Sequence, residues 1–430
     1  MTNLNSHLAT IIRSCPADKT FWIAYSGGMD SHVLLHAMTQ LRESIKFKLH
    51  AIHINHNLNS QANDWAKHCQ NICAKLSVTC EIIQVKVQPK SRESLEACAR
   101  KVRYEAIAKL LLKDDIVLVA QHADDQTETV LLQLLRGSGV AGLAAMPEKS
   151  RLGAGWLVRP LLNYSRSQLF EYAQHLQWVE DDSNSDTRFD RNFLRHEIIP
   201  LLTQRWPNIN KTLGRVASHS AEANELIQLL AEQDLQTCVG QHSEQLFLPT
   251  VNKLAPIRQR NLLRFWLKQL NLPMPSAAHL QHILSDVLMA KSDKQPLVSW
   301  KGGEVRRYKQ HLFAMQNLPP LPTHDITWSF PNPIDLPLGK MTVTRVQNGG
   351  LHLPINTQLQ ICFRKGGEVF QWHKHKRSVK KLLQDAQIPP WQRPFIPLIY
   401  LDNTLITIPN IGVADKCKSQ ENGWQINYGV

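Results

Sequence analysis

A short run of small and acidic residues has the types and spacing of a phosphate-binding loop. It consists of Ser26, Gly27, Gly28, Met29, Asp30 and Ser31. The run follows apolar residues 21–25 and precedes a helix-like stretch at 32–41. Two glycines let the backbone approach a ligand without a Cβ clash, and the unpaired N–H groups at a helix start bind anions with help from the helix dipole. We therefore predict a phosphate site, with an ordinary strand-to-helix turn as the alternative.

The loop differs from the two commonest phosphate-binding patterns. It lacks the Lys-Ser/Thr ending of a Walker A loop, and it does not read G-x-G-x-x-G. We therefore do not expect it to grip a γ-phosphate. Its pattern, S-G-G-x-D-S, resembles the PP-loop of the ATP pyrophosphatase superfamily. Members of that superfamily split ATP into AMP and pyrophosphate to activate a carbonyl oxygen, so the resemblance implies that ATP is the nucleotide.

Three carboxylates form a second candidate group. Asp124, Asp125 and Glu128 follow apolar residues 116–120 and open a helix-like stretch. On a helix, side chains three and four residues apart converge. Capping of the helix N-terminus explains one carboxylate well and three less well. Three acids beside a phosphate loop would repel a triphosphate unless a cation lies between them. That cation could be Mg²⁺, which prefers oxygen ligands, or the ammonium group of a substrate.

Several basic side chains are candidate anion contacts. His53 and His56 lie at the end of the second predicted strand, where a nucleotide contact or a loop-stabilising role is favoured over zinc because no third ligand is apparent. Arg136 opens a glycine-rich segment and suits a second phosphate or base contact. Two further pairs share helix faces and offer planar guanidinium forks: Arg100 with Arg103, and Arg191 with Arg195.

The elements that must position these residues alternate over the first 200 positions. Apolar runs at 21–25, 49–54, 78–87 and 116–120 are separated by helical patterns, which predicts a doubly wound parallel sheet. Ligands of such sheets bind at the carboxyl ends of the strands, so the ends of the first, second and fourth strands should meet at one site. We assign residues 1–210 to this α/β domain, 211–320 to an all-helical middle domain, and 321–430 to a small mixed α+β domain that follows a proline-rich stretch.

Composition narrows the class of protein. The 49 Lys and Arg exceed the 36 Asp and Glu, giving a net charge of +13, and such an excess favours a polyanionic partner. The eight cysteines include no C-x-x-C pair, which argues against a zinc or iron–sulfur site and a secreted disulfide framework. We see no signal peptide and no stretch long enough to span a membrane. These features predict a soluble cytoplasmic protein.

The order of the motifs carries a more specific resemblance. The series runs S-G-G-M-D-S, H-I-N-H, R-K-V-R-Y, H-A-D-D-Q-T-E-T, R-G-S-G-V-A-G-L, R-P-L-L, then D-x-S-N-x-D and R-N-x-x-R-x-x-I-x-P. It closely resembles the tRNA(Ile)-lysidine synthetases, a bacterial PP-loop family. The likeness is tight over residues 20–200, weaker through the middle region, and returns at 364–393, which looks like the C-terminal domain of that family.

The resemblance implies a two-step reaction on RNA. ATP would adenylate the C2 oxygen of the wobble cytidine in an isoleucine tRNA with the anticodon CAU. The side-chain amine of free L-lysine would then displace AMP to give lysidine. Catalysis would fall to Asp30, Asp125 and Glu128, lysine binding to Asp124, Asp125 and Glu128, and ATP binding to residues 26–31 with His53 and Arg136. Asp30 would be a partner of ATP-associated Mg²⁺, without any bound prosthetic group.

The resemblance implies that residues 211–320 bind tRNA or serve as a linker and that residues 321–430 bind tRNA, while the individual contact residues expected lie in both terminal domains. Residues 364–393 hold eight Lys or Arg against two acids, with Trp372 and Trp391 interleaved, and basic and aromatic side chains together suit RNA. A solvated basic surface with core tryptophans is the alternative. The expected contacts are Arg100, Arg103, Arg191, Arg195, Lys374, Lys376, Arg377, Lys380 and Lys381.

Two other functions stay open on the sequence alone. One is a different PP-loop tRNA-modifying enzyme, although a thiolase would usually need catalytic or cluster cysteines. The other is a tRNA-binding protein with an inactive nucleotide site, against which the intact acids argue. The sequence does not reveal the oligomeric state, so a homodimer is also left open.

Overall fold

The computed structural model describes residues 2–429 apart from 17, 58–60, 90–93, 180–185, 292–293 and 348. The chain divides into two compact units, Met1–Ile227 and Gln228–Val430. Most of the D-x-S-N-x-D motif at 181–186 lies outside the described residues. No helix in the described part of the chain is long and apolar enough to cross a membrane.

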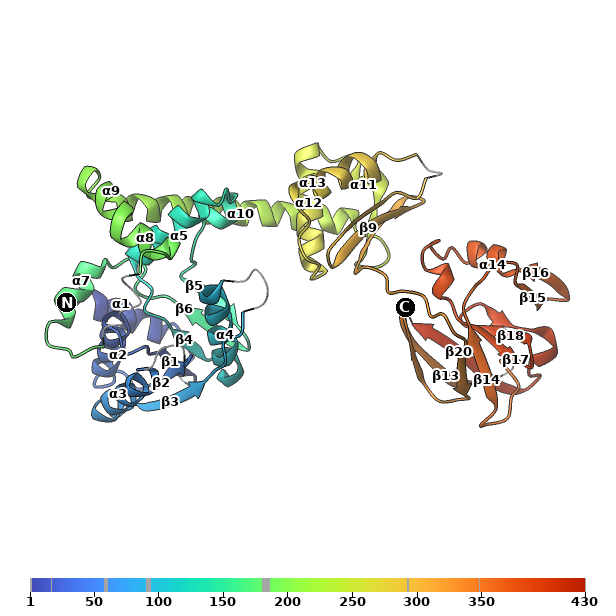
Figure 1. Ribbon diagram of the computed structural model, residues 1–430, viewed down its shortest axis with the longest axis horizontal. Helices are drawn as coiled ribbons and strands as arrows, with labels where there is room; N and C mark the ends of the chain where they lie inside the picture. The colour runs from blue at the N-terminus through green and yellow to red at the C-terminus, as the bar shows by residue number, and fades with distance from the viewer. Residues whose placement is uncertain are drawn as a thin grey trace. The chain divides into compact units, whose positions relative to one another are not determined.

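The first unit is built on a six-stranded sheet in the order β3-β2-β1-β4-β6-β5 (Figure 1). All neighbours are parallel except β5, which is antiparallel to β6. This confirms the predicted doubly wound sheet. The strands are β1 Thr20–Ala24, β2 Lys48–Asn55, β3 Thr79–Gln84, β4 Ile116–Leu118, β5 Lys149–Leu152 and β6 Gly155–Val158.

Helices cover both faces of this sheet, because its strands carry apolar side chains on both sides. In β4, Ile116 and Leu118 join the core that packs under α1, α2 and α3, whereas Val117 joins the core under α4. This alternation is the two-residue period of a strand. The helices are α1 Thr2–Arg13, α2 Met29–Leu41, α3 Ala62–Lys75, α4 Leu95–Leu110, α5 Ala123–Leu135, α6 Val140–Leu143, α7 Arg166–Ala173, α8 Asp190–Phe193, α9 Ile199–Arg205 and α10 Ile209–Cys238, which runs on into the second unit.

The strand order reverses at β1. The chain runs outward from β1 to β2 and β3, then returns to place β4 on the other side of β1. The segments that follow β1 and β4 therefore leave the same edge of the sheet side by side, at the kind of switch point where such folds bind ligands. These segments hold the predicted phosphate loop and the predicted carboxylates.

The middle region is helical as predicted, but the expectation that it is all-helical was wrong. A four-stranded antiparallel sheet, in the order β7-β10-β9-β8, packs with its helices around one core. Its strands are only three to six residues long and lie between helix-like segments, so the sequence pattern did not reveal them. Gly302, at φ +87, marks the tight turn between β8 and β9. The elements are β7 Gln245–Phe247, α11 Leu248–Val251, α12 Pro256–Gln269, α13 Ala277–His282, β8 Leu297–Trp300, β9 Gly303–Tyr308 and β10 His311–Met315.

The C-terminal region is mixed α+β as predicted, and strands dominate it. It has a five-stranded sheet in the order β11-β14-β17-β18-β19, a three-stranded sheet in the order β12-β13-β20, and the hairpin β15–β16. The proline-rich stretch supplies β11 and β12, which are both edge strands, the position that proline tolerates. The elements are β11 Ile326–Ser329, β12 Ile334–Leu336, β13 Gly339–Gln347, β14 Gln358–Cys362, β15 Val369–Trp372, β16 His375–Ser378, α14 Val379–Asp385, β17 Leu398–Leu401, β18 Thr404–Ile408, β19 Gly412–Val413 and β20 Asn422–Gly429.

Candidate active site at the switch point of the sheet

The predicted phosphate loop connects β1 to α2 and is held by its own serines. The Ser31 hydroxyl donates to the Gly28 carbonyl at 2.9 Å and accepts from the Ser26 backbone N–H at 3.2 Å. Gly27 has a φ of +89, and a Cβ there would lie 3.1 Å from the Cys69 Sγ. A side chain at Gly27 would therefore be both strained and crowded. The loop leaves the start of α2 available to an anion.

His53 supports this loop from β2. Its Nδ1 lies 2.9 Å from the Tyr25 carbonyl oxygen and 3.3 Å from the Cys69 Sγ. The side chain is buried, and burial lowers the pKa of His53. A neutral, buried ring bonded to the end of β1 fits the loop-stabilising role considered for it, and its role in ATP binding stays a prediction.

The carboxylate cluster is defined here as Asp30, Asp124, Asp125 and Glu128, and three of these acids lie around a buried histidine. His122, which precedes α5, has its Nε2 at 3.6 Å from Asp30 Oδ2 and 3.5 Å from Asp125 Oδ2. Its Nδ1 lies 3.4 Å from Asp124 Oδ2. The structure thus brings Asp30 of the phosphate loop together with Asp124 and Asp125 of α5 around one ring.

Electrostatics make this histidine the local cation. Burial alone would lower the pKa of His122, but the nearby carboxylates of Asp124, Asp30 and Asp125 outweigh it and raise the pKa to about 10. Burial acts against the charged form of Asp124, yet His122 and the backbone N–H of Arg166 bring its pKa down to about 2. The charge repulsion expected among these acids is therefore relieved within the protein itself.

Glu128 is the most deeply buried acid of the cluster, with only 1% of its surface exposed. The Arg195 Nε donates to one of its oxygens at 2.6 Å, and the Arg191 Nε lies 3.3 Å from the other. Burial raises the pKa of Glu128, and Arg195 opposes that shift. The Arg195 guanidinium also reaches Asp125 Oδ1 at 3.2 Å. These two arginines, which we expected to contact tRNA, thus contact acids of the site, and their role toward tRNA stays a prediction.

Other predicted residues lie away from this cluster. Arg136 is exposed at the C-terminal end of α5, about 20 Å along the helix axis from His122 at 1.5 Å per residue. On α4, the Arg103 Nε donates to the His56 Nε2 at 3.3 Å, and the Arg100 guanidinium lies 5.5 Å from the Tyr104 ring centre.

The C-terminal candidates form an exposed basic hairpin, defined here as residues 369–378. Its turn residues His373 and Lys374 have φ values of +52 and +63. The Asp415 carboxylate accepts from both of their backbone N–H groups, at 3.0 and 2.8 Å. These bonds fix the turn and leave the basic side chains in solvent. All five predicted residues are exposed: Lys374, Lys376 and Arg377 on the hairpin, and Lys380 and Lys381 on α14.

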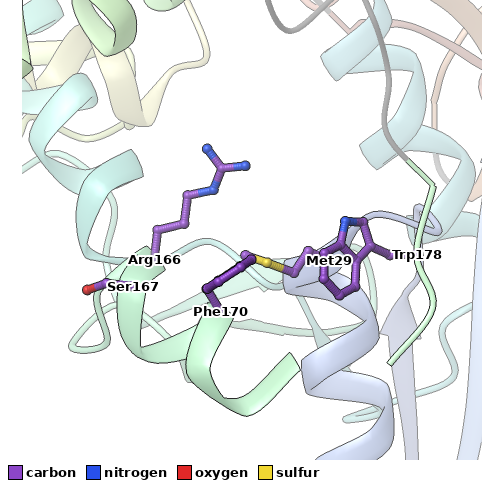
Figure 2. Close-up of a pocket in the computed structure, with 5 residues that line it drawn as sticks. All are labelled: Met29, Arg166, Ser167, Phe170 and Trp178. Carbon is purple, nitrogen blue, oxygen red and sulfur yellow. The ribbon is translucent and has the colours of Figure 1, made fainter. Parts of the chain in front are cut away.

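A cavity of about 310 Å³ adjoins the phosphate loop. It is lined by Met29, the first residue of α2, by Arg166, Ser167 and Phe170 of α7, and by Trp178 (Figure 2). Sequence reasoning identified only Met29. The one available signal for His122 was its place directly before the acids, whereas the α7 residues sit in an ordinary amphipathic pattern that gave no sign of a cavity.

Comparisons with known proteins identify the family of each part of the chain. Three family models match the chain: a PP-loop domain over residues 1–202, a TilS substrate binding domain over 246–313, and a TilS substrate C-terminal domain over 359–428. One segment falls in each of the three predicted domains, whose exact bounds stay a prediction.

Curated relatives match over nearly the whole chain. A tRNA(Ile)-lysidine synthase of Coxiella burnetii is 41% identical over 433 residues, which cover 97% of this chain and 95% of the relative. Its counterpart in Legionella pneumophila strain Lens is 38% identical over 405 residues, covering 92% of each chain. That of Alkalilimnicola ehrlichii is 41% identical over 406 residues, covering 92% of this chain and 90% of the relative.

Proposed function

This chain belongs to the tRNA(Ile)-lysidine synthases, and we propose from that premise that the phosphate loop and the carboxylate cluster carry out both steps of its reaction. The enzyme is an ATP-dependent ligase that forms lysidine on isoleucine tRNA. Membership of this family favours lysidine formation over the activity of another PP-loop tRNA-modifying enzyme and over a tRNA-binding protein with an inactive nucleotide site. We place the reaction in the cytoplasm and assign catalysis to residues 1–210, with tRNA binding shared by 211–320 and 321–430.

In the first step, the C2 oxygen of the wobble cytidine attacks the α-phosphorus of ATP and pyrophosphate leaves. The backbone N–H groups at the start of α2 bind the departing phosphates, because they have no partner within the helix. The serine hydroxyl bonds that close the loop hold these groups in place before ATP arrives. Such preorganised donors stabilise the charge that develops in the transition state.

Asp30 is our candidate for holding ATP-associated Mg²⁺. Its Oδ1 is buried and has no hydrogen-bond partner among the described residues. The described residues contain no ready-made site of three or more His, Cys, Asp or Glu ligands. This pattern fits Mg²⁺, which is commonly bound by one or two carboxylates together with substrate phosphates. When bound there, the ion would neutralise phosphate charge.

In the second step, the side-chain amine of L-lysine attacks C2 and AMP leaves. Free lysine carries an ammonium with a pKa of about 10.4, so the site must first bind a cation and then accept its proton. We assign binding to Asp124, Asp125 and Glu128, and proton acceptance to Asp125 or Glu128. Burial raises the pKa of Glu128, a direction that favours proton acceptance by this carboxylate.

The convergence of Asp30 with Asp124 and Asp125 of α5 around His122 is the observation that carries this proposal. The test is transfer of labelled L-lysine to an unmodified isoleucine tRNA transcript with the anticodon CAU, in the presence of ATP. We expect label in the tRNA together with equal amounts of AMP and pyrophosphate. AMP formed without incorporated lysine would indicate another nucleophile, and neither product would indicate an inactive nucleotide site.

A further inference from the structure

We propose that the cavity between the phosphate loop and α7 is a nucleobase subsite, in which one flat base stacks on Phe170 or Trp178. We call it the base cavity, and it is lined by Met29, Arg166, Ser167, Phe170 and Trp178. The inference rests on the proposed function, since both ATP and the RNA bring a base to this part of the molecule. It adds a contact surface that the phosphate loop and the carboxylate cluster do not supply.

Backbone hydrogen bonds fix the base cavity to the reacting groups. The Val179 N–H, next to Trp178, donates to the Gly27 carbonyl of the phosphate loop at 3.0 Å. The Arg166 N–H, which opens α7, donates to Asp124 Oδ2 at 2.9 Å. A ligand in the base cavity therefore has a fixed position relative to both the phosphate loop and the carboxylate cluster.

The aromatic side chains have a geometry suited to a flat ring. The Phe170 and Trp178 ring centres lie 6.3 Å apart with an interplanar angle of 74°. The two rings therefore form an edge-to-face pair, and the face of either ring that is turned away from the other is available for a base to stack on. Figure 2 shows Met29 beside Phe170, with Trp178 at one end of the cavity and the Arg166 guanidinium extended at the other end. Arginine beside an aromatic platform is a common combination for binding unstacked bases.

Burial distinguishes this arrangement from ordinary packing of α7 against α2. Leu169 and Ala173 of α7 are buried in the core of the first unit and already anchor the helix. Phe170 is instead 52% exposed, while the neighbouring Met29 is buried. An aromatic ring left half in solvent above a buried methionine gains little for the fold, because its apolar surface still meets water. A stacked base would cover that surface.

The first experiment measures base binding directly. AMP and CMP share the phosphate and the ribose, so they differ only in the base, and each is titrated against the full-length protein while tryptophan fluorescence is followed. We expect one of them to quench fluorescence in the wild type and to lose most of that quenching in Trp178→Phe. No change in fluorescence that depends on Trp178, with either nucleotide, would overturn the proposal.

The second experiment separates the two sources of the base. Phe170→Leu keeps an apolar side chain but removes the stacking face, and Phe170→Trp restores it. We expect Phe170→Leu to raise one KM by about tenfold, the scale of losing one base–aromatic stack, and Phe170→Trp to return it toward the wild-type value. An effect on the KM for ATP identifies adenine, and an effect on the KM for tRNA identifies an RNA base.

Failure of this inference and failure of the proposed function give different results. If Phe170→Leu leaves both KM values within twofold of an active wild type, the base subsite is wrong and the reaction stands. If the wild type transfers no lysine but Trp178 still reports nucleotide binding, the base subsite stands and the proposed function is wrong. Leu112→Ala, which removes an exposed apolar side chain beyond the end of α4, serves as the matched control.

Discussion

The carboxylate cluster and the basic hairpin both concentrate charged side chains, but they differ in solvent exposure and in ion pairing. In the cluster Glu128 is buried, as is the adjacent His122, and every carboxylate lies within about 4 Å of a basic side chain. On the hairpin, all four residues of β16 are exposed, and their charges meet water. Charges interact strongly where water is excluded and weakly where it is not. The cluster can therefore direct chemistry, while the hairpin can supply attraction for a polyanion.

Replacement of Asp30 should show most clearly that the cluster, unlike the hairpin, acts in the chemical step. Asp30→Asn keeps the size of the side chain but turns the carboxylate beside His122 into a neutral amide. We expect the rate of lysidine formation at saturating substrates to fall by about 100-fold or more, the scale of losing one preorganised electrostatic group. Asp64→Asn, at an exposed acid of α3, is the control. An Asp30→Asn rate within threefold of wild type would contradict a role for the cluster in the chemical step.

Removal of Arg195 should show that the cluster is also a structural element. Arg195→Met leaves the buried Glu128 without its shortest ion pair, and breaking a buried pair costs about 3 kcal/mol in the free energy of unfolding. Urea unfolding followed by circular dichroism measures this loss. Arg258→Met breaks a comparable pair with the buried Asp234 on α10 and should destabilise the protein without lowering the rate at saturation. Equal loss of rate in both variants would contradict the assignment.

The charge on His122 predicts a dependence of stability on pH. The pKa of His122 is raised to about 10 in the folded state, against about 6.5 when unfolded. Its contribution to stability is therefore complete below about pH 6.5 and is lost as the pH rises through about 10. We expect the difference in unfolding free energy between wild type and His122→Asn to shrink by at least about 1.4 kcal/mol over this interval, the value of one pKa unit. A difference that is constant from pH 6 to 10 would show that the ring is neutral.

Replacement of hairpin charges should have the smallest and most selective effect. Lys376→Ala combined with Arg377→Ala removes two exposed cations, so we expect the KM for tRNA to rise about tenfold with an unchanged maximal rate. The plot of log affinity against log salt should flatten by about 1 to 2 in slope, because fewer phosphate-bound ions are released. Lys67→Ala, at an exposed lysine of α3, is the control. A salt slope equal to that of wild type would remove the hairpin from the tRNA contact.

The sequence predicted the α/β fold well because its local patterns agree with its tertiary structure. Strands buried on both faces, such as β4, read as plain apolar runs, and the helices between them are long. The sheet of the middle region escaped prediction because strands such as β8 alternate buried and exposed residues over only four positions. A pattern this short is easily assigned to the neighbouring helix-like segments instead of to a strand.

The sequence predicted the acidic residues of the candidate site, but it did not predict the charge of His122 or the pairing of the arginines with these acids. The phosphate loop and the acids of α5 each have a local signature. The pairing of Arg195 with Glu128 spans 67 residues of sequence. The charge of His122 depends on Asp30, which lies far away in the sequence at the start of α2. Burial and opposite charges set these states, and both are properties of the folded chain that no local pattern records.

Single-turnover lysidine formation at increasing enzyme concentration tests the central distinction most directly. The rate is measured with excess enzyme over labelled tRNA, for wild type, Asp30→Asn and the Lys376→Ala, Arg377→Ala double variant. We predict that the double variant reaches the wild-type rate once enzyme is saturating, whereas Asp30→Asn stays about 100-fold slower at every concentration. A double variant that remains slow at saturation, or an Asp30→Asn variant that recovers, would contradict the division between a site for chemistry and a surface for binding.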